Sequence, residues 1–225
     1  MIYVVPSLKA KEKLQCEGKA WAESQGFTYV PRGKRTIQDL MDEYGEDFLV
    51  YSSRGPQIDR PEGSHFFSLN MAELRIQNLR KGQRDHLLEA LMGRGSSKLP
   101  ITVLDCTCGF GADAAVASFG LPTGSRVDAL EVSPLLEAVT SWGFSHFVHK
   151  KDDVTAALRR ISLRRGDYRD YLLSDEGPVY DVLYFDPMFQ RPVEASCQFQ
   201  PVRAIMEHGG LTRDLIERAL QKARR

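Results

Sequence analysis

The residues best suited to chemistry in this chain are two glycines and the acidic side chains around them. The stretch VLDCTCGFGADAAVASFG, residues 103–120, holds Gly109 and Gly111 one residue apart, with Asp105 before them and Asp113 after them. Glycines at this spacing permit a tight turn and let a ligand approach backbone N–H groups with no Cβ in the way. The Gly-x-Gly-x-x-Ala pattern also fits a dinucleotide fingerprint, so alone it leaves the cofactor open.

Three acidic side chains narrow the choice of cofactor. Glu131 follows the glycines by about 20 residues, where an acid at a strand end accepts hydrogen bonds from both ribose hydroxyls; the alternative is a solvated strand-end glutamate. Asp105 and Asp113 place carboxylates on both sides of the turn. Like charges would repel a pyrophosphate. The pattern therefore favours a ligand with a cationic amino-acid tail, although Asp113 also suits the first turn of a helix.

A second candidate site is the sequence FDPMF, residues 185–189. It places Asp186, Pro187 and Phe189 directly after an apolar run that predicts a buried strand. An acid, a proline and an aromatic at the carboxyl end of a strand form a reactive-site arrangement that a nicotinamide dehydrogenase does not need. The alternative is that Asp-Pro is only a turn.

The second part of the chain, residues 96–225, alternates strands with helices. Such alternation predicts a parallel sheet with right-handed crossovers and ligands at the carboxyl ends of its strands. The expected strands are 101–106, 126–132, 146–153 and 180–187, and the expected helices are 112–120, 133–143, 155–162 and a last one within 210–225.

The sequence of the first part, residues 1–95, predicts a small α+β domain. This domain is expected to end at the GRGSSKLP stretch. Thr36 and Asp39 have the spacing of a helix capping box. The expected helices are 9–25, 36–45 and 70–92, and the expected strands are 27–31 and 47–53.

Together, VLDCTCGFGADA, ALEVSP and YDVLYFDPMF resemble the class I S-adenosylmethionine (SAM)-dependent methyltransferases. They are most similar to the family of ribosomal small subunit methyltransferase J, which modifies the exocyclic N2 of a guanine in rRNA, and to its uncharacterised relatives. The resemblance covers roughly residues 101–203 and implies a Rossmann-like α/β fold, SAM as the cofactor and RNA as the partner. Residues 1–95 resemble the uncharacterised relatives more than the characterised branch.

The resemblance also implies roles for individual residues. Those at the methionine end of the cofactor would be Asp105, Gly109, Gly111, Ala112 and Asp113. Glu131 would hold the ribose with Val132 beside the adenine, and Asp152 or Asp153, at the end of the third strand, would contact the adenine. Asp186, Pro187 and Phe189 would grip an exocyclic amine, with guanine N2 as the first expectation and adenine N6 as the second. Asp186 would also lie near the cofactor.

Composition limits the partners of the chain. Lys+Arg and Asp+Glu both total 30, so an RNA contact has to come from a local patch. Two groups of cations could supply it, and His65, Phe66 and Phe67 could either stack a base or pack between the two parts. The two cationic groups are Arg32, Lys34 and Arg35, and Arg75, Arg80, Lys81 and Arg84.

The remaining sequence features concern location and assembly. No apolar run is long enough for a membrane span, no histidine spacing indicates a metal, and four cysteines without a CxxC pair favour reduced thiols in a cytoplasmic protein. The chain ends one helix after the fourth strand, whereas class I methyltransferases continue with further strands. We therefore expect that the distal strands are missing by truncation or that a partner chain, such as a second copy in a homodimer, replaces them.

Two other functions fit parts of the sequence. A nicotinamide-dependent oxidoreductase would explain the glycines and Glu131 but not Asp105 or FDPMF. A non-catalytic RNA-binding or assembly module with a retained cofactor pocket would explain the absence of distal strands. The first would bind NAD, and the second would bind RNA without transferring a methyl group.

Overall fold

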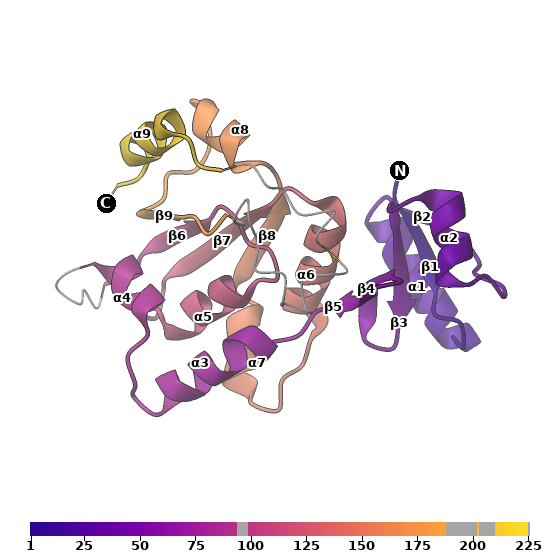
Figure 1. Ribbon diagram of the computed structural model, residues 1–225. Coiled ribbons are helices and arrows are strands. Elements are labelled where there is room, and N and C mark those ends of the chain that lie inside the picture. The colour runs from indigo at the N-terminus through magenta and orange to yellow at the C-terminus, as the bar shows by residue number, and fades with distance from the viewer. Residues whose placement is uncertain (94–98, 188–201, 203–209, 225) are drawn as a thin grey trace.

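The computed structural model describes residues 1–93, 99–187, 202 and 210–224. Its strands form two sheets, one from each part of the chain (Figure 1). The N-terminal sheet has the order β2-β1-β3-β4-β5 and the second sheet the order β8-β7-β6-β9. The α+β character expected for the first part and the parallel α/β character expected for the second are both confirmed.

The N-terminal sheet is mixed. Its first strand, β1, pairs in parallel with β2 and β3, and β3, β4 and β5 follow one another in antiparallel register. Thr36 and Asp39 form the expected capping box at the start of α2. The elements are β1 (Tyr3–Pro6), α1 (Glu12–Ser24), β2 (Thr28–Tyr29), α2 (Ile37–Tyr44), β3 (Phe48–Ser52), β4 (Gly55–Arg60) and β5 (Gly63–Phe66).

Two helices, and not one, connect the sheets. Residues 70–92 were expected to form a single helix, but α3 (Asn70–Arg80) ends before Gly82, which has φ of 76°, and α4 (His86–Met92) begins after it. Asp85 caps α4 by accepting hydrogen bonds from the amides of Leu87 and Leu88 at 3.0 and 3.3 Å. The left-handed glycine followed by a strong N-cap residue explains the break.

All four strands of the second sheet are parallel. Successive side chains of a strand point to opposite faces, so Val103 packs in the core that holds α5 and α6, while Leu104 packs with residues of α8 and α9. Figure 1 shows α8 and α9 on one side of the sheet and α5 on the other. The elements are β6 (Thr102–Asp105), α5 (Ala112–Gly120), β7 (Arg126–Glu131), α6 (Pro134–His146), α7 (Asp152–Leu158), β8 (Ile161–Arg165), α8 (Tyr168–Leu173), β9 (Val182–Tyr184) and α9 (Arg213–Lys222).

The expected third strand at residues 146–153 is wrong. Helix α6 runs on to His146, Asp152 and Asp153 lie in the first turn of α7, and the third strand is β8. Acidic side chains are favourable at a helix N-terminus, and Asp153 also forms an ion pair with Arg80 of α3. The expected helix at 155–162 also extends too far, because α7 ends at Leu158 and β8, which pairs with β7, begins at Ile161.

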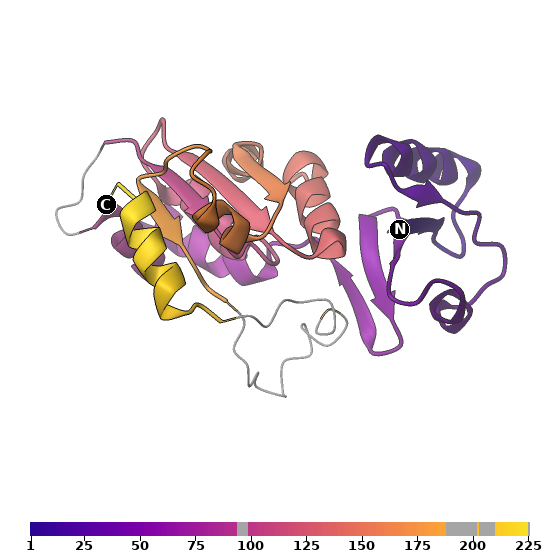
Figure 2. The same cartoon turned by 90° about the horizontal axis from the view of Figure 1, so that it is seen from above.

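The two parts of the chain share one hydrophobic core, and their contact depends on glycines. A Cβ on Gly143 of α6 would lie 1.9 Å from the ring of Phe67, and one on Gly55 of β4 would lie 2.5 Å from Trp142. The Phe67 ring also packs edge-on against Phe144. Figure 2 shows α6 facing the N-terminal sheet. The two parts therefore meet at two separate points, with the Phe67 ring of the N-terminal part against α6 and the Trp142 ring of α6 against β4.

Candidate functional site

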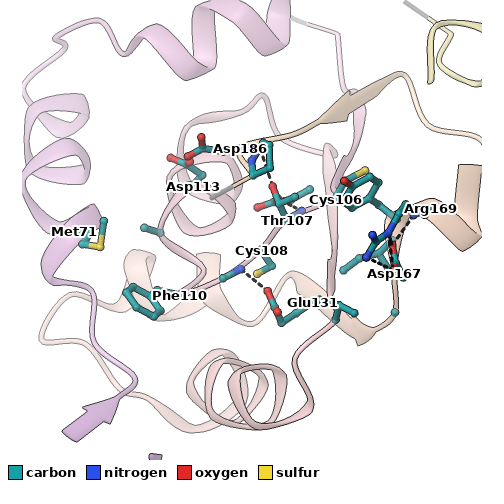
Figure 3. A pocket seen from close by; sticks show the side chains of 18 residues that line it. Met71, Cys106, Thr107, Cys108, Phe110, Asp113, Glu131, Asp167, Arg169 and Asp186 are labelled. Carbon is teal, nitrogen blue, oxygen red and sulfur yellow. Dashed lines mark hydrogen bonds and ion pairs between the residues drawn. The ribbon is translucent and has the colours of Figure 1, made fainter. Parts of the chain in front are cut away.

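The carboxyl ends of all four strands of the second sheet border one cleft (Figure 3). Its walls come from the glycine loop after β6, the ends of β7, β8 and β9, and the start of α3. The described residues that line it are Met71, Asp105, Cys106, Thr107, Cys108, Gly109, Phe110, Ala112, Asp113, Leu130, Glu131, Val132, Gly166, Asp167, Tyr168, Arg169, Asp186 and Pro187.

The two glycines of the loop are required for different structural reasons. Both have positive φ, 54° at Gly109 and 74° at Gly111, which side chains disfavour. A Cβ on Gly111 would lie 2.4 Å from the ring of Phe144, so this glycine allows α5 to approach α6. A Cβ on Gly109 would meet only the Thr107 carbonyl, at 3.9 Å. Gly109 therefore leaves open space beside the cleft, as the sequence predicted.

Glu131 joins the end of β7 to this loop. It is 7% exposed, and its two carboxylate oxygens accept hydrogen bonds from the amides of Gly109 and Ser133, both at 2.9 Å. Burial raises the pKa of Glu131. The carboxylate expected to hold the ribose thus lies in the cleft and is fixed by backbone amides.

Asp105 is the most deeply buried acid of the cleft. It is 2% exposed and accepts a hydrogen bond of 3.1 Å from the Thr107 amide. Burial raises its pKa to about 7, and the carboxylates of Asp113, Glu131 and Asp186 act in the same direction. A buried carboxylate without a countercharge is costly, so a cation bound beside it would be strongly favoured.

Asp113 is already engaged inside the protein. One of its oxygens lies 2.5 Å from the guanidinium of Arg75, and the other accepts a hydrogen bond of 2.7 Å from the hydroxyl of Tyr184. Arg75 also binds both oxygens of Asp85 at 2.8 and 2.9 Å. The cleft therefore contains Asp113, as expected, but of the two carboxylates that flank the glycines, Asp105 is the one without a countercharge among the described residues.

The end of β9 faces the same cleft. Asp186 donates its backbone amide to the hydroxyl oxygen of Thr107 at 2.7 Å, and Pro187 follows it in the cleft wall. Burial, followed by the charge of Asp113, raises the pKa of Asp186. Figure 3 shows the side chains of Asp113 and Asp186 close together. Phe189, the third residue expected here, lies outside the described residues.

The residues at the end of the third strand differ from those expected. Asp152 and Asp153 lie on α7 and are not among the cleft residues. Gly166 and Asp167 follow β8 in the cleft instead, and Asp167 accepts the amide of Arg169 at 2.8 Å and forms an ion pair with its guanidinium at 2.7 Å. The sequence-based prediction missed Gly166 and Asp167 because it placed the third strand at residues 146–153. The RRGDY stretch, residues 164–168, in which a helix-capping aspartate follows a glycine, was the signal that could have located them.

The cleft has the charge expected for a cationic ligand. Its described lining contains five acids and one basic residue, Arg169, which is paired with Asp167. A dinucleotide pyrophosphate would meet mostly like charge, whereas an ammonium or sulfonium group would be attracted. The residues present therefore fit SAM: Asp105 would hold its ammonium group, Glu131 its ribose, and Val132 and Asp167 would border its adenine.

Most of the basic residues proposed for RNA contact are used within the protein. Arg32 is buried and donates to the carbonyl of Arg35, which pairs with Glu43. Arg80 pairs with Asp153, and Arg84 pairs with Glu89. Lys34 and Lys81 make no ion pair among the described residues. The two expected basic patches are thus largely neutralised.

Two further findings concern metals and membranes. Within the described residues, no group of three or more His, Cys, Asp or Glu side chains is arranged to hold a metal ion. Over the same residues, no helix has both the length and the apolar character needed to cross a bilayer.

The chain has relatives among known proteins. It is 28% identical over 224 residues to the uncharacterised protein YpiP of Bacillus subtilis, covering 99% of this chain and 85% of that one. It is 26% identical over 188 residues to ribosomal RNA small subunit methyltransferase J of Marinobacter nauticus, covering 82% of this chain. Of that protein's own length it covers 64%, which is less than two thirds.

The fold has a solved counterpart. The crystal structure of the SAM-dependent methyltransferase NGO1261 from Neisseria gonorrhoeae superposes with a TM-score of 0.61 at 17% identity, covering 98% of this chain and 81% of that one. The model of the family described as "Putative SAM-dependent methyltransferase" matches residues 64–225, which include every side of the cleft. The chain therefore belongs to this family of SAM-dependent methyltransferases, and its cofactor is SAM.

Proposed function

We propose that this methyltransferase modifies an exocyclic amine of a nucleobase in RNA, with guanine N2 in small-subunit rRNA as the first candidate. The observation that carries the proposal is the position of Asp186 and Pro187 at the end of β9, in the cofactor cleft. The relatives named ribosomal RNA small subunit methyltransferase J support the choice of RNA.

The groups at the end of β9 suit an amine acceptor. The Asp186 carboxylate and the Pro187 carbonyl can each accept one N–H of an NH2 group, which turns the nitrogen lone pair toward the cleft. When bound, SAM supplies a methyl group already activated by its sulfonium. Asp186 and Pro187 then contribute orientation, an effect that can amount to several kcal/mol.

The environment of Asp186 also suits the proton that the methylated nitrogen loses. Its raised pKa makes this carboxylate a better base than an aspartate in water. Asp186, or water, would take the proton that the acceptor nitrogen loses when it gains the methyl group, and S-adenosylhomocysteine would be the other product. Phe189 is proposed to stack on the acceptor ring.

The test is methyl transfer from tritium-labelled SAM to small ribosomal subunits and to deproteinised small-subunit rRNA, followed by mass spectrometry of the nucleosides. We expect N2-methylguanosine. Detection of N6-methyladenosine would support the same amine mechanism with adenine, and not guanine, as the acceptor base. RNA binding without transfer to either substrate would favour the non-catalytic module, and methylation of a non-RNA acceptor alone would contradict the proposal.

A further inference from the structure

A second hollow borders the cofactor cleft on the side of the N-terminal sheet. It shares three residues, Met71, Phe110 and Ala112, with the cleft, so the two spaces are neighbours with a common wall. Figure 3 shows Met71 and Phe110 on the side of the cleft away from Asp167 and Arg169. The rest of the hollow is lined by Ser64, His65, Phe66, Ser68 and Asn70, from β5 and the start of α3.

One wall of the hollow is flat, aromatic and uncharged. The ring of His65 stacks on Phe110 with 4.3 Å between centroids and 23° between planes. Burial lowers the pKa of His65 to about 4, so its imidazole is neutral at neutral pH. Aromatic side chains are the surfaces on which proteins stack unpaired bases.

A cation lies on one of the rings that line the hollow. The guanidinium carbon of Arg54, in the turn between β3 and β4, lies 3.7 Å from the centroid of the Phe66 ring, and one of its N–H groups donates to the side-chain oxygen of Gln57 at 3.4 Å. Among the described residues Arg54 makes no ion pair, in contrast to Arg75, Arg80 and Arg84. An arginine stacked on an aromatic ring can donate its other N–H groups to a phosphate.

We propose that this hollow, together with Arg54 on the Phe66 ring, holds a nucleotide of a single-stranded RNA acceptor next to the base that is presented at Asp186. The inference rests on the proposed function. A base can stack on the aromatic side chains of the hollow, Arg54 can contact its phosphate, and the hydroxyls and amide of Ser64, Ser68 and Asn70 can bond to sugar or base edges. The N-terminal part of the chain thereby takes part in acceptor recognition.

The test compares three full-length variants with the parent protein. Arg54→Gln removes the guanidinium that lies on Phe66, and Phe66→Leu removes the aromatic ring. Arg80→Gln is the matched control, because the guanidinium of Arg80 is paired with Asp153. The probe is a fluorescein-labelled single-stranded RNA of ten nucleotides and mixed sequence, with affinity measured by anisotropy at several salt concentrations. Affinity for S-adenosylhomocysteine is measured by calorimetry on the same samples.

We expect Phe66→Leu to weaken RNA binding roughly 5- to 150-fold, the range for loss of one base stack. Arg54→Gln should weaken it and reduce the slope of log K against log salt by about 0.7, as for one lost phosphate contact on a single strand. Arg80→Gln should bind like the parent, and S-adenosylhomocysteine affinity should be unchanged in all three. Arg54 lies in an exposed turn, so its result does not depend on the folding of the Phe66 variant.

Three outcomes would overturn the inference. The first is parental RNA binding and salt slope in Arg54→Gln together with parental RNA binding in Phe66→Leu. The second is the absence of RNA binding by the parent protein. The third is a loss of S-adenosylhomocysteine affinity equal to the loss of RNA affinity, which would assign the hollow to the cofactor. Failure of the parent to methylate any RNA is a separate result: it contradicts the proposed function, whatever Arg54 does to RNA binding.

Discussion

The hydroxyl of Tyr184 donates a 2.7 Å hydrogen bond to Asp113 and so joins the end of β9, two residues before Asp186, to the first turn of α5. The second oxygen of Asp113 lies 2.5 Å from Arg75, which also holds the N-cap of α4 through Asp85. The side of the cleft that contains Asp186 is therefore connected to three helices by one chain of polar contacts. Removal of its central cation should disturb both stability and the placement of Asp186.

Arg75→Gln should destabilise the protein by roughly 1.5–3 kcal/mol, because it leaves two partly buried carboxylates without their cation. Arg80→Gln, on the same helix, is the control; its pair with Asp153 is more exposed, and such pairs contribute about 0–1 kcal/mol. Urea unfolding monitored by circular dichroism measures both. Equal losses of unfolding free energy in the two variants would show that the contacts of Arg75 with Asp113 and Asp85 stabilise the protein no more than the exposed pair of Arg80 with Asp153 does.

Asp105→Asn should stabilise the cofactor-free protein at neutral pH. The folded-state pKa of about 7 lies above the ordinary value of 3.8, so between pH 4 and 7 the folded state holds a proton that the unfolded state has lost, and stability falls as pH rises. The cost above pH 7 is at most roughly 4 kcal/mol. Thermal unfolding measured from pH 4 to 8 should show that the stability of the variant relative to the parent increases across this range. A stability difference that does not change with pH would contradict the raised pKa of Asp105.

SAM affinity should rise with pH up to about 7 and then level off. A bound ammonium group favours ionised Asp105, so binding below pH 7 must release the proton from this carboxylate, and affinity can fall by up to about tenfold per pH unit. Calorimetry at pH 6 in two buffers of different ionisation enthalpy measures the released proton directly. Identical heats in both buffers would mean that Asp105 does not meet the cation.

Glu131→Ala should weaken S-adenosylhomocysteine binding by roughly 2–4 kcal/mol, because it removes a charged acceptor for two ribose hydroxyls. It also frees the Gly109 and Ser133 amides, so loosening of the glycine loop adds to the loss. Asp152→Ala is the control, since this residue lies on α7 outside the cleft. Calorimetry should find the control near the parental affinity; a comparable loss there would restore Asp152 to the site.

Asp186→Ala should abolish most turnover with at most a modest change in cofactor affinity, because the acceptor amine is no longer oriented. Asp186→Asn should keep partial activity, since an amide oxygen still accepts a hydrogen bond. Phe189→Ala should leave cofactor affinity nearly intact and lose stacking of about 1–3 kcal/mol. The measurement is the rate of single-turnover methyl transfer. A parental rate in Asp186→Ala would mean that Asp186 and Pro187 form only a turn and do not orient the acceptor.

The sequence predicted the cleft residues that local patterns mark and missed those that depend on tertiary packing. Gly109, Glu131 and Asp186 lie at or just after the ends of apolar strands with clear boundaries, so their meeting in one cleft was predictable. Asp152 and Asp153 were misplaced because a short apolar run before them has no clear helix or strand period. The pairing of Asp113 with Arg75, 38 residues away, has no local signal at all.

The charge pattern shows the same limit. Arg32, Arg35, Arg80 and Arg84 look like solvent-facing cations in the sequence, and their acidic or carbonyl partners become visible only in the fold. Arg54 has no charged neighbour in the sequence that would mark it as part of a cationic group. Its place over Phe66 depends on the antiparallel pairing of β3, β4 and β5.

The glycines at the junction of the two parts have a consequence for how this protein can be altered. Phe67 and Trp142 each occupy the space that a Cβ on Gly143 or Gly55 would need, and the two pairs run in opposite directions across the junction. Neither part can therefore be exchanged for that of a relative unless ring and glycine are matched at both points. In chimeras built on this chain, we expect these two ring-and-glycine pairs to restrict the crossover sites more than the position of the connecting loop does.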